Sequence, residues 1–270
     1  MGELDEAAVD EAMSEDPDEA LALLADLTGA TDPALRALAR RLAGRLMLDV
    51  ARRGDASRRG TGRMTLKPFA PEEGDLDIDA SIDALAAVRR GSPADPEGLR
   101  VRGWTRPGTA LCLVLDRSGS MGGAPLAASA IAAAAVASRA PEDYSVVVFG
   151  RDVVVVKSQD APKDPERVVT DVLALRGHGT TDLAGALLEA GRQLSRSHAA
   201  RRITLVLSDC RATVEGDPIA ATASLDEVAV VAPASDDEEA TEFARRAGAR
   251  LVTVDGPSSV PAAIAAALRD

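Results

Sequence analysis

The sequence predicts an α/β protein with a doubly wound, Rossmann-like sheet of six mostly parallel strands. One observation leads to this prediction, and a second indicates what precedes the sheet. From residue 109 onward, short apolar runs rich in Val, Leu and Ile alternate with longer segments of helical periodicity, which is typical of parallel strands joined by helices. Residues 1–53, in contrast, have apolar residues at helical spacing alone. A small helical region should therefore precede the sheet.

The order of elements within residues 108–270 follows from these runs. The tripeptide Gly150, Arg151 and Asp152 lies between two short apolar runs and predicts a hairpin, so one strand of the sheet should be antiparallel. The strands are expected at 111–116, 144–149, 153–157, 203–209, 227–231 and 250–254. The helices are expected at 123–140, 165–175, 183–196, 236–247 and 259–268, with Thr181 or Asp182 as the cap of the third, and 217–223 is expected to form at most a short helix.

Residues 1–100 are expected to form a helical N-terminal extension, separate from a domain at 108–270. Pro17 should divide the helical segment 5–27, and Asp32 with Pro33 begins a further helix. Further along, we expect a mobile Gly/Arg/Ser-rich loop near 54–62, a short extended segment at 65–69, a turn at 72–75, an amphipathic helix at 77–89 and a strand or extended segment at 101–106. The first helices are acidic and the next is basic, which fits either a helical hairpin or a docking surface.

Composition excludes several classes of function. The net charge of −12 disfavours a general nucleic-acid or membrane-surface binder, because these need a basic face. The acidic N-terminus does not have the blocks of a signal peptide, and no apolar run is long enough for a membrane span. Cys112 and Cys210 should be too far apart to form a disulfide, so we expect two free thiols. These features predict a cytoplasmic protein.

Oxygen-bearing side chains gather where strands of the predicted sheet end. Asp116, Ser118 and Ser120 directly follow the first strand, and Asp209 ends a second strand. Carboxylates and hydroxyls suit a hard cation such as Mg²⁺, and open α/β sheets bind ligands at this edge. Asp116 and Ser118 alone are equally compatible with simple capping of a turn.

A Gly-rich segment with two threonines, Thr180 and Thr181, precedes the helix at 183 and completes a recognisable set. D-x-S-x-S, a threonine in such a loop, and a later strand ending in Asp resemble the metal-ion-dependent adhesion site (MIDAS) of von Willebrand factor type A (VWA) domains. The resemblance covers about 109–270 and implies the VWA fold and a bound Mg²⁺, with Mn²⁺ or Ca²⁺ as alternatives. It differs from the family at Cys210, where glycine is usual, and at His178, where a small residue is more common. The ligands it implies are Asp116, Ser118, Ser120, Thr181 (with Thr180 as the alternative) and Asp209.

The resemblance implies recognition of a protein partner that offers an acidic side chain to the metal. The segments 74–79 and 101–104, together with the N-terminal helices, make the chain similar to CoxE-like proteins and to the D subunit of magnesium chelatase. These proteins work with MoxR-type AAA+ ATPases, which implies an adaptor or co-chaperone that acts on a client protein. An ATPase-independent scaffolding subunit of a multiprotein complex is the alternative.

An enzyme is disfavoured by the residues themselves. Ser120, His178 and Asp209 have the composition of a hydrolase triad, but the G-x-S-x-G pattern of a nucleophile elbow is absent. The glycine pattern of dinucleotide sites and the lysine of a P-loop are also missing after the first strand. Two histidines and two scattered cysteines do not have the spacing of a zinc site. We therefore expect no catalytic residue.

Overall fold

The computed structural model describes residues 6–30, 32–53, 63–68, 75–89, 98–105, 108–117, 123–175, 177 and 179–269. Contacts divide the chain into two compact units, one of residues 1–57 with 109–270 and one of residues 58–108. This division differs from the expected one, in which residues 1–100 form a single extension. The expected mobile loop at 54–62 lies outside the described residues.

The larger unit is built on a six-stranded sheet with the order β6-β5-β4-β7-β8-β9. All neighbouring strands are parallel except β5 and β6, which form the expected hairpin. The predicted fold class is therefore confirmed. The strands are β4 (Thr109–Asp116), β5 (Tyr144–Phe149), β6 (Val153–Lys157), β7 (Arg201–Leu207), β8 (Glu227–Pro233) and β9 (Arg250–Val254).

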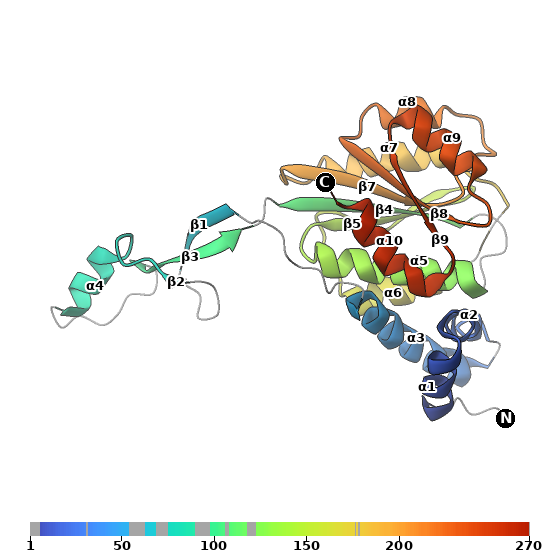
Figure 1. Cartoon of the computed structure of the whole chain (residues 1–270), viewed down its shortest axis with the longest axis horizontal. Coiled ribbons are helices and arrows are strands. Elements are labelled where there is room, and N and C mark those ends of the chain that lie inside the picture. Colours follow the sequence, from blue (N-terminus) through green and yellow to red (C-terminus); the bar gives the residue numbers. More distant parts are fainter. Residues whose placement is uncertain are drawn as a thin grey trace. The chain divides into compact units, whose positions relative to one another are not determined.

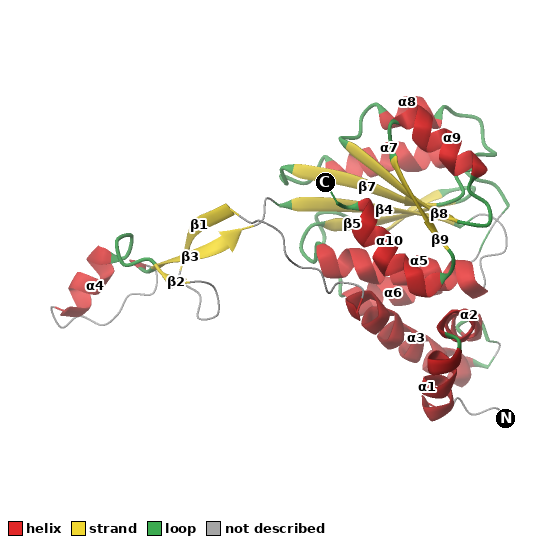
Figure 2. Cartoon of the chain, viewed as in Figure 1, coloured by secondary structure: helices red, strands yellow, loops and turns green. Residues whose placement is uncertain are grey.

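Helices cover both faces of this sheet (Figures 1 and 2). Side chains alternate between the faces: Leu113 belongs to one apolar core, whereas Cys112 and Val114 belong to the other. One face carries α5 (Gly123–Arg139), α6 (Pro165–Leu173) and α10 (Val260–Ala267), which follows the short 3₁₀ helix η2 (Pro257–Ser259). The opposite face carries α7 (Leu183–Leu194), α8 (Pro218–Thr222) and α9 (Glu238–Ala247).

The N-terminal helices form an additional layer outside α5 and α6 (Figure 1). The five consecutive residues 132–136 of α5 are all 0% exposed. Successive helical residues are 100° apart, so these five positions surround the helix and this part of α5 is buried on every side. Ala39, Ala43 and Met47 of α3 form a buried stripe at four-residue spacing. The helices are α1 (Glu6–Glu15), α2 (Pro17–Leu27) and α3 (Pro33–Arg53), and Pro17 separates the first two as expected.

The smaller unit contains an antiparallel sheet that the sequence does not predict. β3 (Arg100–Thr105) pairs with both β1 (Arg63–Pro68) and β2 (Asp75–Leu76). The turn expected at 72–75 is wrong at Asp75. This residue is the first of β2, where pairing with Arg102 holds it in an extended conformation. The helix α4 (Ile82–Arg89) begins later than expected, because residues 78–81 form a turn instead.

The strand order sets the place of a candidate site. β4 is central, and the chain passes from it to β5 on one side and later to β7 on the other. In open parallel sheets, this reversal of direction opens a crevice at the carboxyl ends of the central strands. The residues after β4 and β7 are therefore the first to consider.

Candidate metal centre

Asp116 is the last residue of β4, and its side chain is half-buried at the carboxyl end of that strand. Its Oδ2 accepts a hydrogen bond from Oγ of Ser208 at 2.6 Å. Ser208 is buried and directly follows β7, which pairs in parallel with β4. The hydrogen bond therefore fixes the orientation of the Asp116 carboxylate against the end of the neighbouring strand.

Asp209 and Cys210 continue from Ser208 as a tight turn. Oδ1 of Asp209 accepts a hydrogen bond from the backbone N–H of Arg211 at 2.9 Å, which holds the half-buried carboxylate in place. Cys210 has a φ of 61°, in the left-handed region that glycine adopts most easily. Its N–H donates to Ser208 Oγ at 2.9 Å. The cysteine that stands where the resemblance led us to expect glycine thus adopts a conformation that favours glycine.

Thr181 lies in the segment before α7 and is only 2% exposed, whereas Thr180 is exposed. The N–H of Thr181 donates to Oγ1 of Thr213 at 2.8 Å. Its carbonyl accepts from the N–H of Thr213 at 3.1 Å and of Val214 at 3.3 Å. Asp182 is the cap of α7, since its Oδ1 accepts from the N–H of Gly185.

The loop 208–214 connects the three predicted ligands that the structure describes. It is bonded to Asp116 through Ser208 and to Thr181 through Thr213, and Asp209 lies in the loop itself. Two predicted carboxylates and one predicted threonine are therefore held around one loop at the carboxyl edge of the sheet. The other two predicted ligands, Ser118 and Ser120, lie outside the described residues, as does His178.

Electrostatics shows that both carboxylates lie near Cys210. Burial, followed by the negative charges of Asp209 and Asp116, raises the pKa of its thiol to about 12. Cys112 is buried in β4, where burial likewise raises its pKa to about 12. Both cysteines are free, which confirms that prediction. Neither thiol is a nucleophile at neutral pH.

The donor atoms at this edge fit a hard divalent cation. Within the described ranges, the Thr181 hydroxyl and Oδ2 of Asp209 make no hydrogen bond, so both have lone pairs to offer. In the described part of the chain, no group of three His, Cys, Asp or Glu side chains is arranged to hold a metal ion by itself. A site of two carboxylates completed by hydroxyls suits Mg²⁺, Mn²⁺ or Ca²⁺ rather than zinc.

Replacing Ser208 with alanine should weaken both the fold and metal binding. The change leaves Oδ2 of Asp116 and the N–H of Cys210 without the hydroxyl, which should lower the free energy of unfolding by about 1–3 kcal/mol. Loss of a group that orients a metal ligand should weaken Mn²⁺ binding by roughly tenfold or more. Urea unfolding and calorimetry measure the two effects, with Ser195→Ala as an exposed control. Unchanged Mn²⁺ affinity would limit Ser208 to a structural role.

Ser208, Thr213 and Arg117 are residues of the site that the sequence analysis did not identify. Ser208 directly precedes Asp209, but its bond to Asp116 depends on the register of β4 with β7. Nε of Arg117 is buried and has no hydrogen-bond partner among the described residues. The Arg117 side chain packs over Gly150, where an added Cβ would lie 3.0 Å from its Cγ. A side chain at residue 150 would therefore require the Arg117 side chain to shift.

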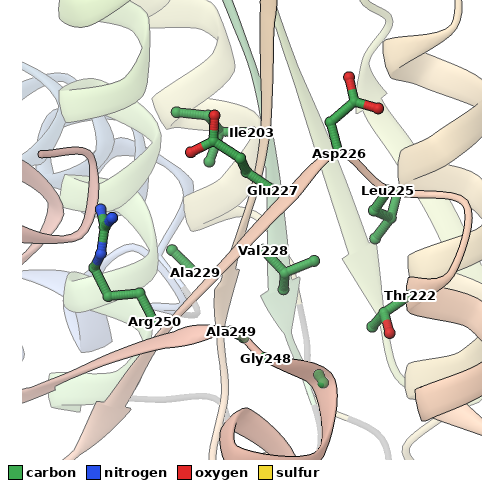
Figure 3. Close-up of a pocket in the computed structure, with 11 residues that line it drawn as sticks. Ile203, Thr222, Leu225, Asp226, Glu227, Val228, Ala229, Gly248, Ala249 and Arg250 are labelled. Carbon is green, nitrogen blue, oxygen red and sulfur yellow. The ribbon is translucent and has the colours of Figure 1, made fainter. Parts of the chain in front are cut away.

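A cavity of about 460 Å³ lies at the opposite edge, at the amino ends of β7, β8 and β9 (Figure 3). Its acidic residues are already paired: Glu227 with Arg201 at 2.7 Å and Asp226 with Arg202 at 2.7 Å. Asp226 points away from Glu227 and Arg250 in Figure 3, so the charged groups do not converge. This cavity is therefore a weaker candidate than the carboxyl edge.

Comparison with protein families identifies the same architecture. The family described as VWA domain containing CoxE-like protein matches residues 38–258. The match includes the three predicted ligands that the structure describes, the loop 208–214 and the whole of the smaller unit. No curated protein matches the sequence. In the described residues, no helix has the length and apolar character needed to cross a bilayer.

Solved structures are similar at the level of the fold alone. An aerotolerance-related membrane protein from Bacteroides fragilis NCTC 9343 has a TM-score of 0.46 and 16% identity, over 59% of this chain and 98% of that one. A von Willebrand factor type A protein from Catenulispora acidiphila has a TM-score of 0.44 and 16% identity, over 60% and 42%. Manganese-loaded Plasmodium vivax TRAP protein has a TM-score of 0.44 and 14% identity, over 57% and 71%.

Proposed function

Since this chain belongs to the family of VWA domain containing CoxE-like proteins, we propose that it is a divalent-metal-dependent protein-interaction module and not an enzyme. The observation that carries the proposal is the 2.6 Å hydrogen bond between Asp116 and Ser208, which joins the ends of β4 and β7 beside Asp209. The proposed metal is Mg²⁺, with Mn²⁺ or Ca²⁺ as alternatives. Its proposed ligands are Asp116, Ser118, Ser120, Thr181 and Asp209.

The residues at this edge perform recognition rather than catalysis in this proposal. Asp116 and Asp209 supply only two negative charges, so a bound divalent ion keeps the ability to accept an acidic side chain from a partner. Ser208 and Thr213 hold the ligands in fixed positions and so reduce the entropy lost on binding. The two thiols are buried with raised pKa values and do not supply a nucleophile.

The proposed partner is a MoxR-type AAA+ ATPase in the cytoplasm, with this protein as an adaptor or co-chaperone that brings it a client. The support is the CoxE-like family itself and the presence of α1–α3, which add a layer beyond the sheet and its covering helices. An ATPase-independent scaffold is the competing proposal, and it differs in one measurable property. Only the adaptor should change the ATPase rate of its partner.

The test is capture of partners from the native cytosol with three baits: wild type, Asp116→Ala and Asp164→Ala. Asp164 caps α6 and is the matched control, because it removes a carboxylate that is not a proposed ligand. Each bait is used in Mg²⁺ and in EDTA. We expect wild type and Asp164→Ala to retain an AAA+ ATPase in Mg²⁺ but not in EDTA. We also expect the ATP hydrolysis rate of the purified ATPase to change when this protein is added.

Three outcomes would contradict the proposal. Equal retention in EDTA would show that binding does not depend on a metal. Retention by Asp116→Ala in Mg²⁺ would remove the metal site from the interface. Metal-dependent retention of a partner that has no ATPase activity would favour the scaffold over the adaptor.

A further inference from the structure

The helix α2 lies against the start of α5. The segment just before α5 carries two of the proposed metal ligands, Ser118 and Ser120. Leu21, Leu24 and Ala25 of α2 are buried, and the helix packs on both α5 and η2. α5 and η2 begin at the carboxyl edge of the sheet, since they follow β4 and β9. The N-terminal layer therefore reaches the same edge as the candidate metal centre.

Two carboxylates of α2 bind backbone N–H groups at this edge. Oδ1 of Asp26 accepts a hydrogen bond from the N–H of Gly123, the first residue of α5, at 2.5 Å. Oδ1 of Asp18 accepts one from the N–H of Ser258 in η2 at 2.7 Å. The two aspartates are eight residues apart and so project from the same side of α2. One helix therefore anchors the start of two others.

The contact at Gly123 is close and specific. The first N–H groups of a helix have no partner within the helix, and a nearby carboxylate satisfies one of them. The carboxylate at α5 comes from 97 residues earlier in the chain. Gly123 has a φ of +51°, and a Cβ there would lie 3.6 Å from Oδ2 of Asp26 and 3.9 Å from Cβ of Ala22. α2 thus packs directly on the backbone of Gly123.

We infer that Asp26 is a positioning residue for the metal centre, an inference that rests on the proposed function. Asp116 is held at one end by Ser208, and Gly123 is held at the other end by Asp26. The chain between these two fixed points carries two of the five proposed ligands. Asp26 fixes the point at which that chain must enter α5, and through it the N-terminal layer sets the affinity for the ion. The acceptor oxygen of Asp26, rather than its charge, is what the backbone N–H requires.

The test measures Mn²⁺ affinity by calorimetry on the full chain, with thermal unfolding in EDTA measured in parallel. Asp26→Ala removes the acceptor and should weaken Mn²⁺ binding by roughly threefold to tenfold. Asp26→Asn keeps an acceptor oxygen and should stay within about twofold of wild type. Asp18→Ala is the matched control, because it removes the equivalent contact of the same helix at η2. It should lower the unfolding temperature without changing Mn²⁺ affinity.

Each other result overturns the inference. Wild-type affinity in Asp26→Ala would show that the contact only supports the fold. An equal loss of affinity in Asp18→Ala would assign the effect to docking of α2 as a whole, and an equal loss in Asp26→Asn would assign it to charge. A wild-type chain that binds no Mn²⁺ would instead overturn the proposed function, and the inference with it.

Discussion

Replacing Asp116 with alanine is expected to abolish divalent-ion binding and leave the fold intact. Asp116 supplies one of the two carboxylates proposed as ligands at the carboxyl edge of the sheet. Loss of a ligand should weaken Mn²⁺ binding more than loss of a group that only orients a ligand, such as Ser208. We therefore expect Mn²⁺ affinity to fall by at least about 100-fold. The side chain is half-buried at the end of β4, outside the apolar cores, so the fold should lose no more than the hydrogen bond from Ser208, about 1–3 kcal/mol.

The clearest measurement of this effect is the stabilisation that the ion gives. At a free Mn²⁺ concentration of 100 times its Kd, a bound ion adds about 2.7 kcal/mol to the free energy of unfolding. Wild type should show this increase in urea unfolding, and Asp116→Ala should show no more than about 0.4 kcal/mol of it. Asp164→Ala removes the cap of α6, which should lower the free energy of unfolding by about 1 kcal/mol. Mn²⁺ should nevertheless raise the free energy of unfolding of this variant by as much as it does in wild type. A full increment in Asp116→Ala would show that the ion binds elsewhere.

The sheet could be predicted from the sequence because its strands are continuous apolar runs. β4 and β5 are buried on both faces, so their residues need no alternation of polar and apolar type and stand out as runs of Val and Leu. The site could be predicted for a related reason: Asp116 and Asp209 interrupt the apolar pattern where β4 and β7 end. Parallel pairing then brings two such ends to one edge, whatever the loops between them contain.

The supporting contacts could not be predicted in this way, since they depend on three-dimensional neighbours. The bond from Ser208 to Asp116 requires the register of β4 with β7, and the strand β2 is only two residues long. One feature of the sequence reflects the packing of the N-terminal helices on α5. The uniformly apolar segment 132–136 has no polar face, which is typical of a helix covered on every side.

Replacing Leu21 with alanine should therefore destabilise the whole larger unit rather than the N-terminal helices alone. Leu21 of α2 is 0% exposed and belongs to the core that includes α5 and the strands. Truncation of a fully buried leucine should lower the free energy of unfolding by about 2–5 kcal/mol. Leu23 lies on the same helix but is 60% exposed, so Leu23→Ala should change stability by no more than about 0.5 kcal/mol.

Hydrogen exchange distinguishes this expectation from an independent N-terminal extension. If α2 and the sheet unfold as one cooperative unit, Leu21→Ala should speed the exchange of the most protected amides in β4 and β7 by the same free energy that urea unfolding measures. The amides of α2 and β4 should respond together. An extension that folds by itself would instead give faster exchange in α1–α3 and unchanged protection in β4. That result would also remove the N-terminal layer from the positioning of Gly123, because a helix that opens separately from α5 cannot fix its first residue.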